Sequence, residues 1–145
     1  MREVRRSALL PYSAGQMYGL VTDVLRYPEF LPWCTGARIL ADEGEFVTVS
    51  LGLHRGLARG SFTTRNRLVP GRSVEMRLVE GPFTMLEGRW EFAPIQDAGT
   101  RAELLMRFET RGILGGIALG PAFEHACNQM VDAFARRAQQ VYRAG

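Results

Sequence analysis

Lysine is absent from this 145-residue sequence: all 18 basic residues are arginine, against 15 acidic residues, and the net charge is +3. We attribute this bias to the codon usage of a GC-rich bacterial genome. A guanidinium group can hold a phosphate with two hydrogen bonds. An excess of three charges is nevertheless too small to indicate a nucleic-acid-binding protein by itself, and we do not expect DNA as a partner.

Cysteine and long hydrophobic runs are also scarce. Cys34 and Cys127 both lie among apolar residues, which favours two buried thiols in a reducing compartment over a disulfide. No uncharged run is long enough to span a membrane, and the run from Gly112 to Phe123 is also interrupted by glycines and a proline. Charged residues between Arg2 and Arg6 exclude the apolar region of a signal peptide. We therefore expect one domain over residues 1–145, in the cytoplasm or at the surface of the inner membrane.

Histidine is equally rare, and its placement argues against a metal site. Only His54 and His125 are present. His125 and Cys127 are two residues apart, which places them on different sides of a helix, and neither histidine belongs to a cluster of ligands. No set of serine, histidine and aspartate stands out either. We expect no catalytic residue, no metal and no cofactor.

The first forty residues predict a strand followed by two short helical segments. Residues 1–10 alternate like a strand, and Ser13 with Gln16 forms a capping box that starts a helix. The apolar stripe of this helix has the spacing of an amphipathic helix and consists of Met17, Leu20, Val21 and Val24. Between Tyr27 and Cys34 two prolines limit helical structure to one or two turns. The large side chains of this second segment must plug a core or line the mouth of a cavity.

Six further strands and a final helix follow. Period-two alternation predicts an antiparallel sheet with one dry face, from strands near residues 38–41, 46–51, 62–68, 74–78, 86–92 and 102–108. A helix of about 22 residues is expected to start at Pro121, which suits a first helical turn. Its apolar stripe consists of Phe123, Cys127, Met130, Phe134, Ala138 and Val141.

This order of elements predicts an α+β fold: a curved, seven-stranded antiparallel sheet wrapped around a long C-terminal helix, with two short helices after the first strand. One helix covers such a sheet incompletely. We therefore expect an apolar cavity between the sheet and the helix. Thr64 and Asn66, with Thr48 or Ser50, are the polar residues expected to point inward. They suit hydrogen bonds to a carbonyl better than proton transfer.

Several stretches in this order resemble the coenzyme Q-binding and ribosome-association toxin family of the START (Bet v 1-like, helix-grip) superfamily. The most specific stretch is Tyr-Pro-Glu-Phe-Leu-Pro-Trp-Cys at residues 27–34, and further matches lie at residues 12–24, 62–66, 81–92 and 130–138. The resemblance implies the helix-grip fold and a non-catalytic protein that binds ubiquinone or another polyprenyl quinone and supports respiration.

Large apolar side chains are the candidate ligand-binding residues, with plain core packing as the alternative for each. They are Phe30, Leu31, Trp33, Phe62, Met76, Phe83, Trp90, Phe92, Phe108, Phe123, Met130 and Phe134. Trp33 and Phe83 are expected to flank the mouth of the cavity. Phe30, Leu31 and Trp33 are further expected to form an exposed lip that touches the inner membrane.

Two alternatives follow from the same resemblance. A family member blocks the joining of ribosomal subunits, which would require an exposed arginine surface for contact with the large subunit. Arg55, Arg59, Arg65 and Arg67 lie on neighbouring strands and could form that surface. The second alternative is a polyketide cyclase, which would need a tuned acid or base in the cavity. Glu87 is expected to face solvent, which disfavours this reading.

Overall fold

The computed structural model describes residues 1–96, 98–111 and 113–142. Ten elements follow one another along the chain. They are β1 (Arg2–Leu10), α1 (Ala14–Thr22), the 3₁₀ helix η1 (Val24–Glu29), β2 (Cys34–Asp42), β3 (Phe46–Arg55), β4 (Ala58–Val69), β5 (Ser73–Glu80), β6 (Phe83–Ile95), β7 (Gly99–Thr110) and α2 (Ile113–Val141). The predicted order of elements is therefore confirmed.

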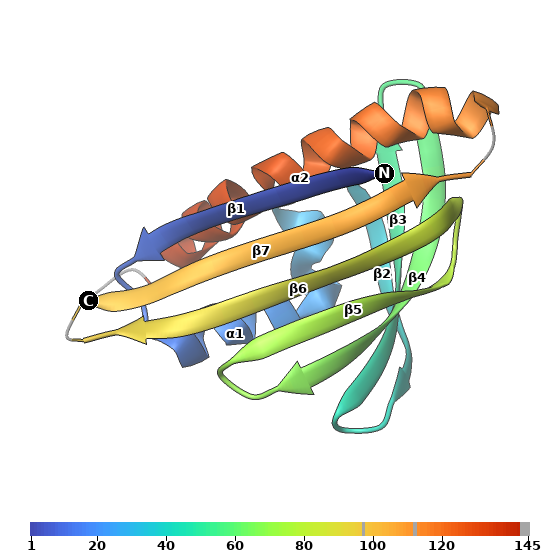
Figure 1. Ribbon diagram of the computed structural model, residues 1–145. Helices are drawn as coiled ribbons and strands as arrows, with labels where there is room; N and C mark the ends of the chain where they lie inside the picture. Colours follow the sequence, from blue (N-terminus) through green and yellow to red (C-terminus); the bar gives the residue numbers. More distant parts are fainter. Residues whose placement is uncertain (97, 112, 143–145) are drawn as a thin grey trace.

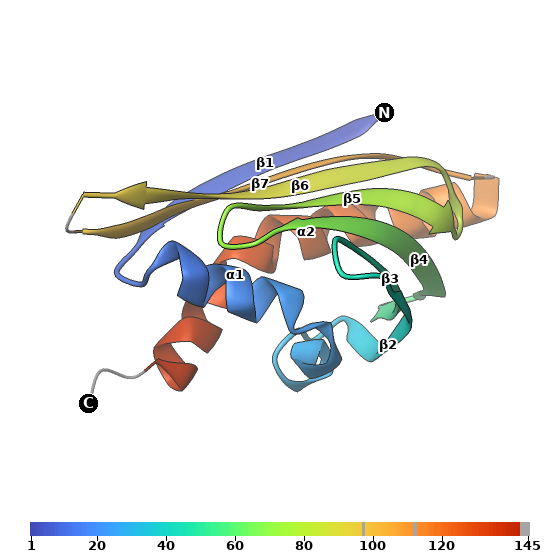
Figure 2. The ribbon, with the colours of Figure 1, turned by 90° about the horizontal axis from the view of Figure 1, so that it is seen from below.

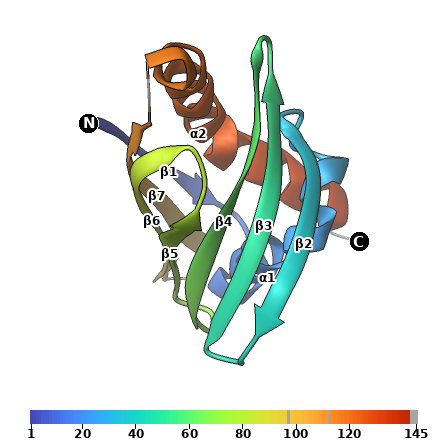
Figure 3. The ribbon, with the colours of Figure 1, turned by 90° about the vertical axis from the view of Figure 1, so that its right-hand side faces the viewer.

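All seven strands belong to one antiparallel sheet of order β1-β7-β6-β5-β4-β3-β2. The sheet curls around α2, with β1, β7, β6 and β5 on one side of the helix and β4, β3 and β2 on the other (Figure 3). The helix runs along the inner face of the sheet (Figure 1). The short helices α1 and η1 lie below α2, between the two ends of the sheet (Figure 2). This is the predicted seven-stranded fold around a C-terminal helix.

Local sequence signals set several boundaries. The Ser13 hydroxyl accepts a hydrogen bond from the Gln16 backbone N–H at 3.1 Å, and the Gln16 side chain accepts one from the Ser13 N–H at 2.9 Å. This reciprocal pair satisfies two backbone donors at the start of α1. The turn between β2 and β3 requires a positive φ at Gly44, which is +87°. Glycine adopts that conformation without steric cost.

The start of α2 differs from the prediction. The helix begins at Ile113, eight residues before Pro121, which lies inside it. Proline removes one intrahelical hydrogen bond. The helix nevertheless continues through Pro121, because residues before and after it are buried against the sheet. Leu119 and Phe123 are both buried, and Arg2 of β1 pairs with Glu124 at 2.8 Å. Tertiary contacts therefore override the local stop signal.

The C-terminal end of the apolar stripe of α2 was also predicted wrongly. Val141 was expected to be buried but is 49% exposed. Its neighbour Tyr142 makes the inward contacts instead. The Tyr142 hydroxyl donates to the Gln16 carbonyl oxygen at 3.0 Å, and its ring lies 6.0 Å from that of Tyr12. The last turn is therefore fastened to α1 through an aromatic side chain.

Replacing Ser13 by alanine tests the contribution of the capping box. The substitution removes the acceptor for the Gln16 N–H, and we expect a loss of about 1 kcal/mol in the free energy of unfolding, measured by urea denaturation. Ser7→Ala on the exposed part of β1 is the matched control, expected to change stability by less than about 0.5 kcal/mol. Equal effects of the two substitutions would contradict a role for the cap.

Candidate functional site: an inner cavity and an outer charged face

An apolar cavity lies between the inner face of the sheet, α2 and η1. Its open volume is about 50 Å³. Its lining residues are Val24, Tyr27, Trp33, Val49, Leu51, Phe62, Thr64, Asn66, Met76, Leu86, Trp90, Leu104, Met106, Phe123, Ala126, Cys127 and Met130. Drug-sized ligands occupy sites of about 300–1,000 Å³. In this conformation the cavity has room for a few water-sized groups only.

Half of the predicted ligand-binding residues line this cavity. These are Trp33, Phe62, Met76, Trp90, Phe123 and Met130. The other six do not line it: Phe30, Leu31, Phe83, Phe92, Phe108 and Phe134. The six residues that line the cavity come from the strands, from the segment before β2 and from α2, and the fold brings them together around one space.

Phe83 does not flank a cavity mouth. It is completely buried, and its ring centroid lies 5.9 Å from that of Phe62, 6.3 Å from Phe108 and 5.0 Å from Phe123. Phe123 in turn lies 4.8 Å from Phe108. These edge-to-face contacts are typical of an aromatic core. Phe83 and Phe108 therefore close one end of the molecule.

The exposed lip was also predicted wrongly. Leu31 is 2% and Trp33 is 6% exposed, so neither can touch a membrane in this structure. The Trp33 carbonyl accepts a hydrogen bond from the His54 N–H at 2.9 Å, which ties the segment to β3. Phe30 is half-buried, and its ring lies 5.1 Å from that of Phe134. The segment plugs the core, which was the alternative open from the sequence.

Some cavity residues were not predicted, although the signal was present. Thr48 and Ser50 were considered as inward-facing, but their neighbours Val49 and Leu51 are buried and line the cavity. Three apolar residues at positions 47, 49 and 51 carry that alternation. Tyr27, Leu104 and Ala126 also line the cavity. The small Ala126 carries no sequence signal, because its role depends on how α2 is rotated about its own axis.

Two polar side chains point into the cavity as predicted. Thr64 and Asn66 are both buried on β4, and the Thr64 hydroxyl donates to the Asn66 amide oxygen at 2.8 Å. This hydrogen bond uses the Asn66 oxygen as acceptor, so the Asn66 NH₂ group remains available as a donor. The site therefore combines a large apolar lining with one polar position on its sheet side.

The titratable groups of the cavity are Tyr27 and Cys127. Burial raises the pKa of both above their ordinary values, because an apolar environment disfavours the charged form. The Tyr27 hydroxyl also donates to the Val21 carbonyl oxygen. Both groups stay protonated at neutral pH, so neither is suited to act as a general base. The lining contains no carboxylate and no histidine.

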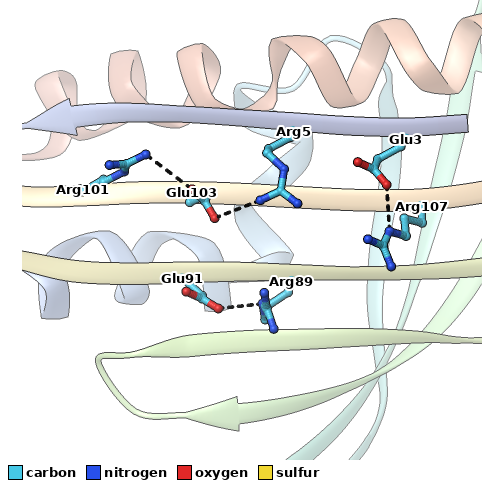
Figure 4. A network of polar contacts seen from close by, with 7 residues as sticks. All are labelled: Glu3, Arg5, Arg89, Glu91, Arg101, Glu103 and Arg107. Carbon is cyan, nitrogen blue, oxygen red and sulfur yellow. Dashed lines mark hydrogen bonds and ion pairs between the residues drawn. The ribbon is translucent and has the colours of Figure 1, made fainter.

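The outer face of the sheet carries rows of charge across the strands. In one row Glu3, Arg107, Glu87 and Arg77 lie directly opposite one another on β1, β7, β6 and β5. Arg107 pairs with Glu3 at 2.9 Å, and Arg89 in the adjacent row pairs with Glu91 at 2.7 Å (Figure 4). Opposite charges facing each other stabilise a sheet modestly. Most of this half of the outer face is therefore internally neutralised.

The four arginines predicted to form a ribosomal surface divide into two pairs. Arg65 lies 3.5 Å from Glu43, and Arg67 lies 2.9 Å from Glu45. Both are thus engaged in ion pairs at the β2–β3 end. Within the described part of the chain, Arg55 and Arg59 have no carboxylate within 4.0 Å. The predicted surface is therefore reduced to the β3–β4 turn.

Among the described residues, no three histidine, cysteine or acidic side chains lie close enough together to hold a metal ion. No helix in the same residues is both long and apolar enough to span a bilayer.

Solved structures of other proteins share this fold. An aromatase/cyclase of a Streptomyces species, ZhuI, superposes with a TM-score of 0.87 at 21% identity, over 99% of this chain and 96% of the other. A START superfamily protein of Mycobacterium smegmatis superposes with a TM-score of 0.80 at 20% identity, over 96% and 98%. At these identities the likeness establishes the fold alone.

The chain belongs to the family described as polyketide cyclase / dehydrase and lipid transport, whose model matches residues 10–135. Within it, the chain is 46% identical to the "Ribosome association toxin RatA" of Pseudomonas aeruginosa over 96% of both chains. It is 27% identical to the mitochondrial "Coenzyme Q-binding protein COQ10 homolog B" of Xenopus laevis, over 97% of this chain and 59% of the other. The resemblance found in the sequence is thereby confirmed.

The buried thiols predict how stability depends on pH. Burial raises the pKa of Cys34 and Cys127, whereas an unfolded thiol ionises near pH 8.5. Below that pH both states keep the proton. Above it the unfolded chain releases protons that the folded protein retains, so the free energy of unfolding should fall by up to about 1.4 kcal/mol per pH unit for each thiol.

Urea denaturation between about pH 7 and pH 10 measures this slope. Cys127→Ala should lower stability near pH 7, because it removes buried contacts, and should make the alkaline slope shallower, so that the difference from the unsubstituted protein narrows as the pH rises. Cys34 remains in this variant as an internal reference. An identical slope in the variant and the unsubstituted protein would show that Cys127 ionises as readily when folded as when unfolded.

Proposed function

We propose that this protein associates with the ribosome by binding the large subunit and hindering its joining with the small subunit. The observation that carries the proposal is the 46% identity, over 96% of both chains, to a protein named for ribosome association. A similar relative in Escherichia coli has the same name and is 43% identical over 99% of this chain. Such a role would place the protein in the cytoplasm.

The chemistry of the outer surface agrees with a partner made largely of RNA. Eighteen arginines provide groups that hold phosphate with two hydrogen bonds. Several exposed arginines have no carboxylate neighbour among the described residues, Arg55 and Arg59 among them. Association of this kind requires a complementary surface and no catalytic group, in keeping with a cavity whose titratable groups stay protonated.

Sedimentation with purified ribosomal subunits tests the proposal. We expect the protein to migrate with the large subunit and not with the small one, and to lower the yield of joined ribosomes when the two subunits are mixed. Contacts to RNA phosphate should weaken steeply as salt rises. Migration with neither subunit at low salt, or an unchanged yield of joined ribosomes, would contradict the proposed function.

The cavity supports a second candidate function, the binding of ubiquinone or another hydrophobic molecule. Its lining is apolar, with Thr64 and Asn66 as the polar position, which suits a quinone carbonyl. Each CH₂ group removed from water contributes about 0.8 kcal/mol. The relative named for coenzyme Q binding is more distant, at 27% identity. A protein with this role would work at the inner membrane surface.

A quinone would have to widen the cavity, which now measures about 50 Å³. Methionines are the side chains best suited to give way, since they are unbranched and flexible. Met76 and Met106 both fill the space beside Gly88, whose missing side chain leaves room for them. We therefore place the quinone head between β4 and α2, with Met76, Met106 and Met130 displaced.

Filling the cavity separates this candidate from ribosome association. Ala126→Val adds two methyl groups to a buried position on the cavity wall, and we expect the amount of ubiquinone that co-purifies to fall at least about tenfold while the fold is kept. Ala93→Val on the exposed face of β6 is the control. Mass spectrometry of lipid extracts supplies the readout. Equal quinone in both variants would contradict binding in this cavity.

A further inference from the structure

Charge is distributed unequally between the two halves of the sheet. From Phe46 to Val74, a stretch that includes all of β3 and β4, the sequence contains five arginines and no acidic residue. The preceding segment, residues 30–41, also lacks acidic residues and contributes Arg38 of β2. In the other half, arginines and glutamates alternate and pair (Figure 4). In the half formed by β2, β3 and β4, Arg38, Arg55 and Arg59 have no carboxylate within 4.0 Å among the described residues.

Within that half, the positive charge is concentrated toward the β3–β4 turn. Arg65 and Arg67, at the far end of β4, are engaged by glutamates. Arg59 lies opposite His54 on the outer face, whereas Arg55 lies opposite the buried Ala58 and therefore on the other face of the hairpin, beside the turn. The nearest acidic residue in the strand register is Glu80, which lies opposite Thr63. Thr63 is four positions along β4 from Arg59, which is about 13 Å.

The turn itself holds one apolar side chain in solvent. Gly56 and Leu57 connect the paired residues Arg55 and Ala58, and Gly56 has a φ of +59°. A two-residue hairpin needs such a conformation, and glycine supplies it. Leu57 is consequently held at the tip and is 97% exposed. The hairpin projects at one end of the molecule (Figure 3).

The base of this hairpin is packed against the rest of the protein, whereas its tip is exposed to solvent. Leu53 and Ala58 are both buried, and the His54 N–H is bonded to the Trp33 carbonyl. Arg38 continues the basic surface on β2, where it lies opposite Ser50. We name the group Arg38, His54, Arg55, Leu57 and Arg59 the basic hairpin. Arg55 lies on one side of the turn and Arg59 on the other, with the exposed Leu57 between them at the tip.

We infer that the basic hairpin is the element that contacts ribosomal RNA, an inference that rests on the proposed function. Arg55, Arg59 and Arg38 would bind backbone phosphates, to which their guanidinium groups are geometrically matched. Leu57 would pack against an unstacked base or a ribose in a loop, the kind of RNA that proteins recognise most often. The cations supply affinity, and the projecting shape selects an accessible groove or loop.

An anionic membrane is the competing partner for a basic, apolar tip, and the observations favour RNA. A single myristoyl chain gives only marginal membrane binding, and Leu57 buries far fewer carbons. The remaining residues of the turn, Gly56 and Ala58, add little apolar surface. Arg38 and Arg59 lie back from the tip, along the side of the sheet. This layout fits a ridge of phosphates better than a flat lipid surface.

The test compares a double variant with a matched control in ribosome sedimentation. Arg55→Ala with Arg59→Ala removes two unpaired charges from the hairpin. Arg72→Ala with Arg136→Ala removes two exposed charges that also lack a carboxylate within 4.0 Å in the described residues, at the β4–β5 turn and on α2. Both variants lose the same net charge. Thermal unfolding confirms that each remains folded.

We expect the hairpin variant to bind the large subunit about tenfold more weakly near 100 mM salt, and to lower the slope of log affinity against log salt by about 1.5. The control variant should keep the slope of the unsubstituted protein to within about 0.5. Leu57→Ser should weaken binding several-fold with no change in slope, since it removes no charge.

Each other outcome overturns the inference in a recognisable way. If the unsubstituted protein does not bind the large subunit, the proposed function fails and the inference with it. If it binds and the hairpin variant binds as well as the control variant, only the inference fails. If the hairpin substitutions abolish binding to vesicles of anionic phospholipid and leave subunit binding unchanged, the hairpin is a membrane contact and the RNA assignment is wrong.

Discussion

The packing of α2 into the curled sheet through edge-to-face aromatic contacts is the interaction on which the remaining structure depends. Phe123 lies against Phe62, Phe83 and Phe108 at 4.8–5.4 Å between ring centroids. About three turns further along the helix, Phe134 lies 5.4 Å from both Tyr27 and Trp90. The contacts of Phe123 and Phe134 fix how α2 is rotated about its axis and how far it lies from the sheet. The space left between them is the cavity.

The same packing separates two kinds of surface. The inner face is almost entirely apolar, and its polar groups, such as Thr64 and Asn66, bond to each other. The outer face carries rows of charged residues, which neighbouring strands either pair or leave without a partner. A hydrophobic ligand and a ribosome would consequently use different faces of one sheet. Each proposed function can therefore be tested by substitutions that leave the other site unchanged.

Sequence periodicity was sufficient for the secondary structure, the antiparallel sheet and the inward rows, because alternation and capping are local properties. The capping box of Ser13 and Gln16 and the inward direction of Thr64 and Asn66 were found in this way. It was insufficient at Pro121, where a local stop signal lost to the burial of Leu119 and Phe123. The segment from Tyr27 to Cys34 was similarly undecided, since its burial depends on residues far away in the chain.

The amino-acid sequence by itself determined the fold class, the family and the residues that face inward, because apolar spacing and specific motifs carry that information along the chain. Only the tertiary structure decided which inward residues line a cavity and which fill the core. That distinction depends on how α2 is placed against seven strands. The structure also decided which arginines are neutralised, since a cross-strand register brings Arg67 to Glu45 and leaves Arg55 and Arg59 without such a partner at the hairpin tip.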